Sequence, residues 1–331
     1  MTQRTFAVLG GGGVFAVHYV KYILDHCNPK MVISIGRSPE RGSAYTLDVG
    51  RGDERYRYEQ IHMTYEQDRL FEVFDRYQPE VIVNFAALAY ATSWDKAWRY
   101  FDTNVVALAK MVEDLSRRDY LKKYVQIGSS EVYGSSNMAL DEKAVPNPTS
   151  PYAVSKLAGD QFLETYWAVR KFPMNIIRPS NAYGPGQLLY RVLPRAVLCG
   201  LTGKRLPLQG GGRVRKSYLH SFDLAAAIQL IVDKAPHGEV YNAGPEQPCS
   251  IRHLVELVAA GMGLPFEELC NIVPGRVGED AQYWLDSTKI RTQLGWKPTI
   301  DLKTGIADMI EWGRKYQDQI LADPTEFFLR A

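Results

Sequence analysis

The sequence has few cysteines, no metal-binding pattern and no long apolar run. Its four cysteines are widely spaced without a C-x-x-C pair, and its six histidines do not stand at metal-ligand spacings. We therefore expect free thiols, no metal ion and a reducing compartment, the cytoplasm. No apolar run reaches the ~18 residues that a membrane-spanning helix needs. The N-terminal MTQRTFAVLG leads directly into a strand pattern, so we expect no signal peptide.

An excess of charge of either sign is also lacking. Lysine and arginine number 39 and aspartate and glutamate 37, a net charge of +2. This balance argues against a nucleic-acid binder, and any anion site must come from locally placed groups. At 331 residues, 46% of them hydrophobic, the chain is long enough for a full core and more than one structural unit.

What the sequence does contain is an alternation of short apolar runs with amphipathic helical stretches. The strand candidates in the first half are Thr5–Leu9, Met31–Ile35, Val81–Phe85, Tyr124–Ile127 and Met174–Ile177. Strands separated by helices are typical of βαβ units. We predict an α/β fold: a Rossmann-like, doubly wound parallel sheet with a smaller C-terminal α/β substrate lobe.

The composition changes near residue 180, where glycine, proline and basic residues become frequent. A strand and helix in Ser217–Val232 are predicted to rejoin the sheet. We therefore expect residues 1–180, with about 217–243, to form the dinucleotide-binding domain. Residues 181–216 and 244–331 are expected to form the nucleotide-sugar-binding lobe.

A glycine-rich stretch follows the first predicted strand and opens the first helix. Gly10 and Gly13 permit a tight turn and a close approach of the backbone to a pyrophosphate, and the small Ala16 lets the helix pack near the sheet. The helix N-terminus, at Val14 and Phe15, supplies unpaired N–H groups. This context predicts a bound nicotinamide dinucleotide.

The end of the second predicted strand bears on which dinucleotide this is. NAD-binding chains commonly place a carboxylate there, which binds the ribose 2′-hydroxyl. Here Gly36 and Arg37 occupy that place, and Arg37 is suited to a 2′-phosphate. The sequence therefore favours NADP, with NAD and a solvated Arg37 as the alternative.

A tyrosine and a lysine stand four residues apart at the start of a predicted helix. Ser150 is the expected cap and Pro151 lies in the first turn, so Tyr152 and Lys156 share one face. An ammonium near a phenol lowers the pKa of the phenol. We expect Tyr152 to take a proton from a substrate hydroxyl as hydride leaves the same carbon.

Small and acidic residues follow the fourth predicted strand, where an open parallel sheet presents its catalytic groups. If the chain stays extended, Ser129 and Glu131 project to the same side. Ser129 can then hydrogen-bond a substrate hydroxyl, and Glu131 can act as a second proton-transfer group.

Together these motifs resemble the extended short-chain dehydrogenase/reductase family. The matching stretches are G-x-x-G-x-x-A from Gly10, N-F-A-A from Asn84, S-S-E-V-Y-G from Ser129, Y-x-x-x-K from Tyr152, R-P-S-N-A-Y-G-P from Arg178 and L-G-W-K-P from Leu294. The resemblance covers most of the chain. It implies a Rossmann lobe, a smaller nucleotide-sugar lobe and a homodimer formed through a four-helix interface.

Within that family, the S-S-E-V-Y-G stretch resembles sugar-nucleotide 4,6-dehydratases of the GDP-mannose and dTDP-glucose types. Such an enzyme oxidises C4, removes the C5 proton, loses water from C6 and returns hydride to C6, and recycles a tightly bound cofactor. Glu131 suits the C5 step, which a 4-epimerase lacks. A 4-epimerase, a decarboxylase or a 4-ketoreductase remains an alternative, and a non-catalytic dinucleotide-binding sensor is an alternative of a different class.

The resemblance also assigns site residues. The expected catalytic residues are Ser129, Ser130, Glu131, Tyr152 and Lys156. The expected cofactor contacts are Gly10, Gly13, Val14, Phe15, Gly36, Arg37, Phe85, Ala86, Ala87, Asn104, Tyr152, Lys156 and Pro179. The expected substrate contacts are Tyr90, Ser129, Asn181, Arg215, Lys216 and Arg276.

Several residues depart from the family pattern. Ser130 stands where the dTDP-glucose enzymes have an acidic aspartate, as in the GDP-mannose type. Tyr90 lies in a stretch unlike that of either dehydratase, and His62 replaces the usual aspartate near the adenine. Asp223 is interpreted as a helix cap. The nucleotide base remains open.

Overall fold

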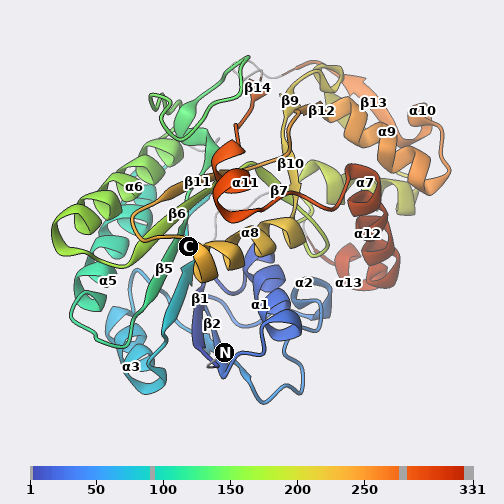
Figure 1. Cartoon of the computed structure of the whole chain (residues 1–331). Coiled ribbons are helices and arrows are strands. Elements are labelled where there is room, and N and C mark those ends of the chain that lie inside the picture. Colours follow the sequence, from blue (N-terminus) through green and yellow to red (C-terminus); the bar gives the residue numbers. More distant parts are fainter. Residues whose placement is uncertain (1–2, 90–93, 276–281, 324–331) are drawn as a thin grey trace.

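The computed structural model describes residues 3–89, 94–275 and 282–323. A seven-stranded parallel sheet lies at its centre, with the order β11-β6-β5-β4-β1-β2-β3 (Figure 1). Its strands are β1 (Thr5–Leu9), β2 (Met31–Gly36), β3 (Tyr56–Gln60), β4 (Val81–Asn84), β5 (Lys123–Ile127), β6 (Met174–Pro179) and β11 (Val240–Ala243). Strands β1, β4, β5 and β6 are almost wholly buried, as expected of a parallel sheet covered on both faces.

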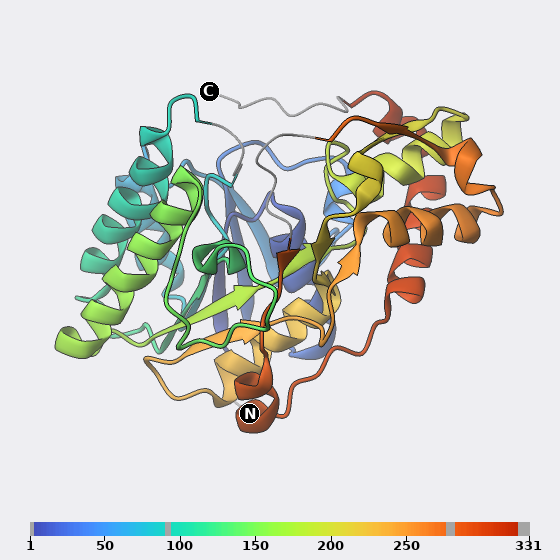
Figure 2. The ribbon, with the colours of Figure 1, turned by 90° about the horizontal axis from the view of Figure 1, so that it is seen from above.

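Helices cover both faces of this sheet. One face packs against α1 (Val14–His26), α8 (Ser221–Lys234) and α11 (Thr288–Leu294). The other packs against α3 (Gln67–Tyr77), α5 (Leu108–Leu115) and α6 (Pro151–Arg170). Figure 2 shows α5 and α6 together on one side of the strands. Among the described residues, no helix combines the length and the apolar character that crossing a bilayer requires.

Smaller sheets and a separate helical cluster complete the fold. The short strands are β7 (Asn181–Tyr183) with β10 (Tyr218–His220), β9 (Arg215–Lys216) between β12 (Cys249–Ser250) and β14 (Gln282–Tyr283), and β8 (Leu206–Gln209) with β13 (Cys270–Val273). A third core joins α7 (Val192–Thr202), α9 (Ile251–Met262) and α12 (Leu302–Lys315). The remaining elements are α2 (Ser43–Thr46), α4 (Trp98–Phe101), η1 (Asp102–Ala107), η2 (Ser130–Tyr133), η3 (Gly210–Gly212), α10 (Phe266–Leu269) and α13 (Gln317–Leu321).

The predicted α/β, Rossmann-like fold is confirmed, with three local corrections. The strand at 218–220 does not rejoin the main sheet but pairs with β7. The strand that does rejoin it is β11, which pairs with β6 and was not predicted. Edge strand β3 was also missed, because its sequence YRYEQ is polar and only partly buried.

Asp223 is not the cap of α8, contrary to the prediction. The Nδ1 atom of His220 caps that helix and accepts a hydrogen bond from Phe222 N–H. Asp223 is buried and instead accepts hydrogen bonds from Thr299 and from Ile300 N–H. Its carboxylate thus attaches the 299–300 turn to α8.

Sheet order fixes where a ligand can bind. The chain runs from β1 through β2 to β3 in one direction, then from β4 through β5 and β6 to β11 in the other. Ligands of open α/β sheets bind beyond the carboxyl ends of the strands at such a reversal. The turns after β1, β4, β5 and β6 therefore frame the candidate site.

Candidate functional site

The glycine turn after β1 leaves no room for side chains. Gly10 has a φ of +76°, and a Cβ there would lie 2.7 Å from the backbone nitrogen of Ala86. Gly13 caps α1 in an extended conformation without a side-chain cap, so Val14 and Phe15 begin the helix with free N–H groups. A backbone cradle against an uncapped helix N-terminus fits a pyrophosphate.

The end of β2 has no space for a carboxylate. A Cβ on Gly36 would overlap the hydroxyl of Tyr58, which donates a hydrogen bond to Ser38 O at 2.7 Å. Arg37 follows directly. Burial lowers the pKa of His62, and the positive charge of Arg37 lowers it further, so the two side chains lie near each other. The cation at this end of the sheet is therefore Arg37, beside an imidazole whose neutral form is favoured.

Helix α6 carries the predicted tyrosine and lysine. Ser150 caps it as predicted, accepting a hydrogen bond from Ala153 N–H at 3.1 Å. Tyr152 and Lys156 are one helical turn apart, and Lys156 reaches the carboxyl end of β5. The Lys156 ammonium is 4% exposed and donates to Ile127 O at 2.6 Å. The lysine therefore fixes α6 to β5. The turn that follows this strand, residues 128–134, carries the predicted Ser129 and Glu131, and we call it the catalytic turn.

The electrostatics of Tyr152 differ from the prediction. Burial raises the pKa of its phenol, and the nearby Glu131 carboxylate raises it further. A hydrogen bond with Ser129 and the positive charge of Arg191 act in the opposite direction. The Lys156 ammonium is directed to Ile127 O. The pKa of the phenol is thus raised, whereas the sequence predicted that it is lowered.

Ser129 and Glu131 do come together with Tyr152, but through a different backbone path. Ser129 is extended (φ −152°, ψ 139°) and caps the short helix η2, its Oγ accepting from Glu131 N–H at 3.2 Å. The chain thus turns at Ser130 instead of staying extended, and the Ser130 side chain is buried. Proximity of the predicted residues follows from this tight turn.

Asn104 lies between the loop after β4 and helix α6. It lies in the π-helical segment η1, where its side chain accepts from Leu88 N–H and donates to Leu88 O and Ser155 Oγ. Ser155 in turn donates to Tyr152 O at 2.7 Å. Every polar atom of the Asn104 side chain is therefore engaged within the protein. It connects the loop after β4 to helix α6, beside the other predicted cofactor residues.

The remaining predicted cofactor residues lie at the same edge of the sheet. Phe85, Ala86 and Ala87 form the loop after β4, with Ala86 N–H donating to Asn84 Oδ1 at 2.9 Å. Pro179 ends β6. The backbone of Phe85 and Ala86 closes over Gly10. The structure thus brings three separate segments of the prediction into one cradle.

The predicted substrate residues are only partly described. Asn181 N–H donates to Ser217 O at 3.0 Å, which places β7 beside the segment that carries Lys216. Arg215 is exposed, and its guanidinium donates to Pro248 O at 2.8 Å. Tyr90 and Arg276 lie outside the described residues.

Arg191 is a candidate site residue that the sequence analysis missed. It is the N-terminal flanking residue of α7, and its charge reaches Tyr152, as the shift in the phenol pKa shows. The only sequence signal was a basic residue shortly after the Y-G-P-G-Q stretch. Nothing local in the sequence indicated that α7 begins across from α6.

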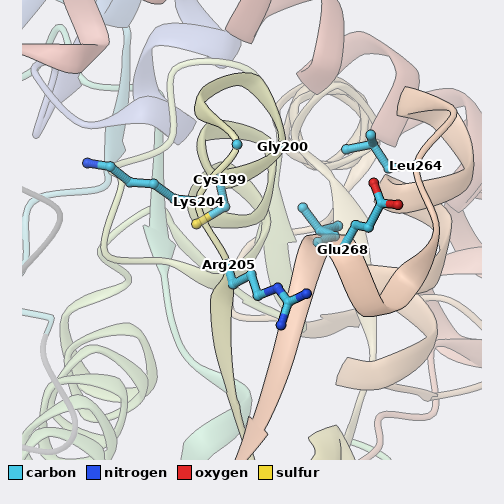
Figure 3. A pocket seen from close by; sticks show the side chains of 8 residues that line it. Cys199, Gly200, Lys204, Arg205, Leu264 and Glu268 are labelled. Carbon is cyan, nitrogen blue, oxygen red and sulfur yellow. The ribbon is translucent and has the colours of Figure 1, made fainter.

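Two surface pockets lie apart from these residues. One, of about 260 Å³, is formed by the end of α7 with Leu264 and Glu268, and Lys204 and Arg205 border it (Figure 3). The other, of about 260 Å³, lies between α1 and the segment around Ile300 and Asp308. Neither pocket is lined by Ser129, Tyr152 or Lys156. The candidate site is therefore defined by the contacts among these side chains and not by a pocket.

Comparison with known proteins identifies the family. The family model for GDP-mannose 4,6 dehydratase matches residues 8–309. The chain belongs to this family. The predicted relationship to sugar-nucleotide 4,6-dehydratases of the extended short-chain dehydrogenase/reductase type is confirmed, and with it the prediction of an enzyme of the dehydratase type.

Curated relatives carry the same type of name. A mouse dTDP-D-glucose 4,6-dehydratase is 28% identical over 317 residues, covering 93% of this chain and 88% of the relative. A dTDP-glucose 4,6-dehydratase from Streptomyces niveus is 33% identical over 237 residues, or 71% of this chain and 70% of that one. The family model and these relatives name different nucleotides, so the base is not decided by them.

Solved structures extend the comparison to three dimensions. The dTDP-glucose 4,6-dehydratase of Bacillus anthracis, in complex with NAD, matches with a TM-score of 0.86 at 26% identity, covering 95% of this chain and 98% of that one. A Bacillus cereus UDP-glucuronic acid 4-epimerase matches with a TM-score of 0.84 at 23% identity, covering 94% and 99%. At that lower identity the epimerase supports the fold alone.

Proposed function

We propose that this protein converts a nucleoside-diphosphate hexose to its 4-keto-6-deoxy derivative by intramolecular transfer of hydride from C4 to C6 and loss of water. The cofactor is a nicotinamide dinucleotide, which accepts and returns hydride when bound. The substrate loses its C4 hydride and hydroxyl proton, then its C5 proton and C6 hydroxyl, and regains hydride at C6 and a proton at C5. The net change is the loss of one water.

Each step is assigned to a residue of this chain. Tyr152 takes the proton of the 4-hydroxyl, with Ser129 bonded to the phenol and directed to the same hydroxyl. Glu131 removes the C5 proton, which the C4 ketone has made acidic. Ser130, the neighbour of Glu131 in the sequence, relays a proton to the departing C6 hydroxyl. Lys156 donates to Ile127 O and so holds the helix that carries Tyr152.

One observation carries this proposal: the Glu131 carboxylate lies near enough to the Tyr152 phenol to raise its pKa, and both side chains are partly exposed. Oxidation at C4 requires only the phenol and Ser129. A second base beside them is needed when the adjacent carbon must also lose a proton. That requirement separates a 4,6-dehydratase from a 4-epimerase, which returns hydride to the carbon that lost it.

The test is incubation with a panel of GDP-, UDP-, dTDP- and CDP-hexoses and UDP-glucuronate, followed by mass analysis of the products. A product lighter by one water, with no net consumption of cofactor, is the expected result. A product of unchanged mass, lighter by carbon dioxide, or heavier by two hydrogens with cofactor oxidised contradicts the proposal in favour of an epimerase, a decarboxylase or a ketoreductase. Absence of turnover with the whole panel favours the dinucleotide-binding sensor.

NADP is the dinucleotide that we propose. Tyr58 excludes a carboxylate at Gly36, so the usual partner of the 2′-hydroxyl is missing at the end of β2. Arg37, which follows Gly36, gives that place a cationic surface instead. A 2′-phosphate pairs with a guanidinium more strongly than a 2′-hydroxyl does. We also expect the cofactor to stay tightly bound, because one turnover both reduces and reoxidises it.

We propose that residues 1–180 with about 217–243 hold the cofactor and that 181–216 with 244–331 hold the nucleotide. The support is that Asn181 lies beside the Arg215–Ser217 segment, which offers cations to two phosphates. Arg276, outside the described residues, is proposed as a third contact, and Tyr90 as a contact to the sugar. The short strands β7 and β9 thus provide the diphosphate site.

A homodimer is also proposed, through the outer faces of α4, η1 and α6. Apolar side chains that are exposed on these helices are Phe101, Val106, Val154 and Val169. Exposed apolar side chains that gather on neighbouring helices indicate an interaction surface. A measured solution mass of one chain would contradict this proposal.

The cytoplasm is the compartment that we propose. All four cysteines are free thiols, although Cys199 and Cys270 are buried where a structural disulfide would be protected. Proteins that fold in oxidising compartments commonly pair their cysteines. Mass analysis of the native protein after thiol labelling would detect a disulfide, which would contradict the proposal.

A further inference from the structure

Beneath the catalytic turn lies a buried row of four polar side chains from four different elements. They are Asp160 on α6, Arg178 on β6, Tyr133 in η2 and Asn242 on β11, each at most 4% exposed. Hydrogen bonds join them in that order, and we call them the polar row. None of them has a catalytic, cofactor or substrate role in the proposed reaction.

The first bond of the polar row is a buried ion pair. Arg178 Nε donates to Asp160 Oδ2 at 2.9 Å. Asp160 lies one helical turn beyond Lys156, and its negative charge opposes the lowering of the Lys156 pKa by burial. Removing two charges from water is costly, and apolar residues of similar volume commonly stabilise a core better. A buried pair at this place therefore suggests a role other than stability.

The second and third bonds extend from the ion pair to the catalytic turn. Arg178 Nη1 donates to Tyr133 Oη at 2.8 Å, and the guanidinium lies 5.2 Å from the centre of the Tyr133 ring. Tyr133 Oη donates to Asn242 Oδ1 at 3.0 Å. The stem of Arg178 also packs against Gly128, where a Cβ would lie 2.9 Å from its Cγ. Arg178 thus contacts the catalytic turn on both sides of Ser129–Glu131.

The last member of the polar row fixes the segment that comes after the turn. Asn242 Nδ2 donates to Leu140 O at 3.0 Å, and Asn242 N–H donates to Glu142 Oε1 at 2.7 Å. The segment after Gly134 is thereby attached to β11. Glu131 consequently sits in a short turn whose start, end and continuation are all held by the polar row.

We propose that Tyr133, through Arg178 and Asn242, is a positioning residue that aims Glu131 at the C5 proton. This inference rests on the proposed dehydratase function. Ser129 has a second support, because it is joined to Tyr152 and directly follows β5. Glu131 lies within η2, where its N–H donates to Ser129 Oγ at the start of the turn, and the other end of the turn, at Tyr133, is held by the polar row. Loosening the row therefore affects C5 deprotonation more than C4 oxidation.

The test compares Tyr133→Phe with Tyr241→Phe. Both tyrosines are buried and each loses one hydroxyl, but Tyr241 bonds Gln293 on the other side of the same strand that carries Asn242. In stopped-flow experiments with the nucleotide sugar that the wild type dehydrates, Tyr133→Phe should slow product formation about tenfold while C4 oxidation changes less than about twofold. Reduced nicotinamide should then accumulate, which is seen as a rise in its absorbance. The Tyr241→Phe variant should behave as the wild type does.

A second measurement needs no substrate or cofactor. Amide hydrogen exchange of residues 129–147 should be faster in Tyr133→Phe than in the wild type, and unchanged there in Tyr241→Phe. Tyr133→Leu, which also removes the ring from Arg178, should enlarge both effects, and thermal unfolding shows whether each variant is folded.

The outcomes separate the two proposals. Equal slowing of both half-reactions in a folded Tyr133→Phe variant, or no slowing, overturns the positioning role while leaving the dehydratase function intact. A wild-type protein that releases no dehydrated product with any nucleotide sugar fails the function first. In that case the positioning role fails with the function, and faster exchange at residues 129–147 in Tyr133→Phe would show a structural role of the polar row alone.

Discussion

The two halves of the candidate site are built in contrasting ways. Around Tyr152 and Lys156 the polar side chains are buried and cross-linked by hydrogen bonds from β5, α6 and η1. On the proposed nucleotide side, Arg215 is exposed and strands β7 and β9 are only three and two residues long. Proton and hydride transfers require fixed distances, whereas phosphates are held by charge over a wider range of geometries. The residues proposed for proton and hydride transfer thus lie on long, buried elements, whereas those proposed to bind the phosphates lie on short strands.

The largest effect is expected at the rigid half, from Tyr152→Phe. The phenol is the proposed base for C4 oxidation, so its removal should lower turnover by about 10³-fold or more. Stopped-flow absorbance should then show no reduced nicotinamide after substrate is added. Substrate binding, measured by calorimetry, should change little, and a large loss of affinity would contradict the contrast between the two halves.

Glu131→Gln should have the next largest effect, about 10²–10³-fold on product release. Here the cause is the loss of the C5 base, and C4 oxidation continues. Reduced nicotinamide should therefore accumulate, in contrast to Tyr152→Phe. If the variant forms dehydrated product at the wild-type rate, Glu131 is not the base.

A pH dependence sharpens the same distinction. Tyr152 must lose a proton to act, and its phenol pKa is raised by burial and by Glu131, so the rate of C4 oxidation should rise with pH above neutrality. Glu131→Gln removes a charge that raises this pKa and should shift the rise to lower pH. Arg191→Met removes a charge that lowers it and should shift the rise to higher pH. Shifts in the same direction would contradict these assignments.

Which parts of the site could be predicted depends on the same division between local and distant contacts. The glycine turn and the Ser150 cap depend on neighbouring residues, and the structure reproduces both. The turn at Ser130 and the Lys156 contact to Ile127 depend on how α6 packs against β5, which spacing does not report. The bonds of Asn104 to Leu88 and Ser155 could not be predicted either, because these partners are distant in sequence.

The fold shows the same limit. Strands with apolar runs were predicted, whereas polar β3 was missed because an edge strand needs few apolar residues. Likewise, β11 was missed because the preceding strand and helix had been assigned to the main sheet. Pairing between segments far apart in the chain decides both cases, and a single sequence carries no direct record of it.

A smaller effect is expected at the cofactor's adenosine end. Arg37→Ala should weaken NADP binding about tenfold, corresponding to about 1.4 kcal/mol, and leave NAD binding within about twofold. Fluorescence titration of the two cofactors measures both affinities. If the wild type binds NAD more tightly than NADP, or the variant loses both equally, Arg37 does not read a 2′-phosphate.

The smallest effect is expected on the nucleotide side. Lys216→Ala should raise the KM for the nucleotide sugar a few-fold and leave kcat nearly unchanged, because a cation at one phosphate binds the ground state and the transition state alike. Arg215→Ala is the matched control: its guanidinium is engaged by Pro248 O, and adjacent residues of a strand face opposite ways. It should change KM less than Lys216→Ala does. The KM effect of Lys216→Ala should also shrink as salt is raised, since salt screens a partly exposed charge. A fall in kcat for Lys216→Ala as large as that of Glu131→Gln would mean that the nucleotide side helps to place the reacting carbons. The contrast between the two halves of the site would then be wrong.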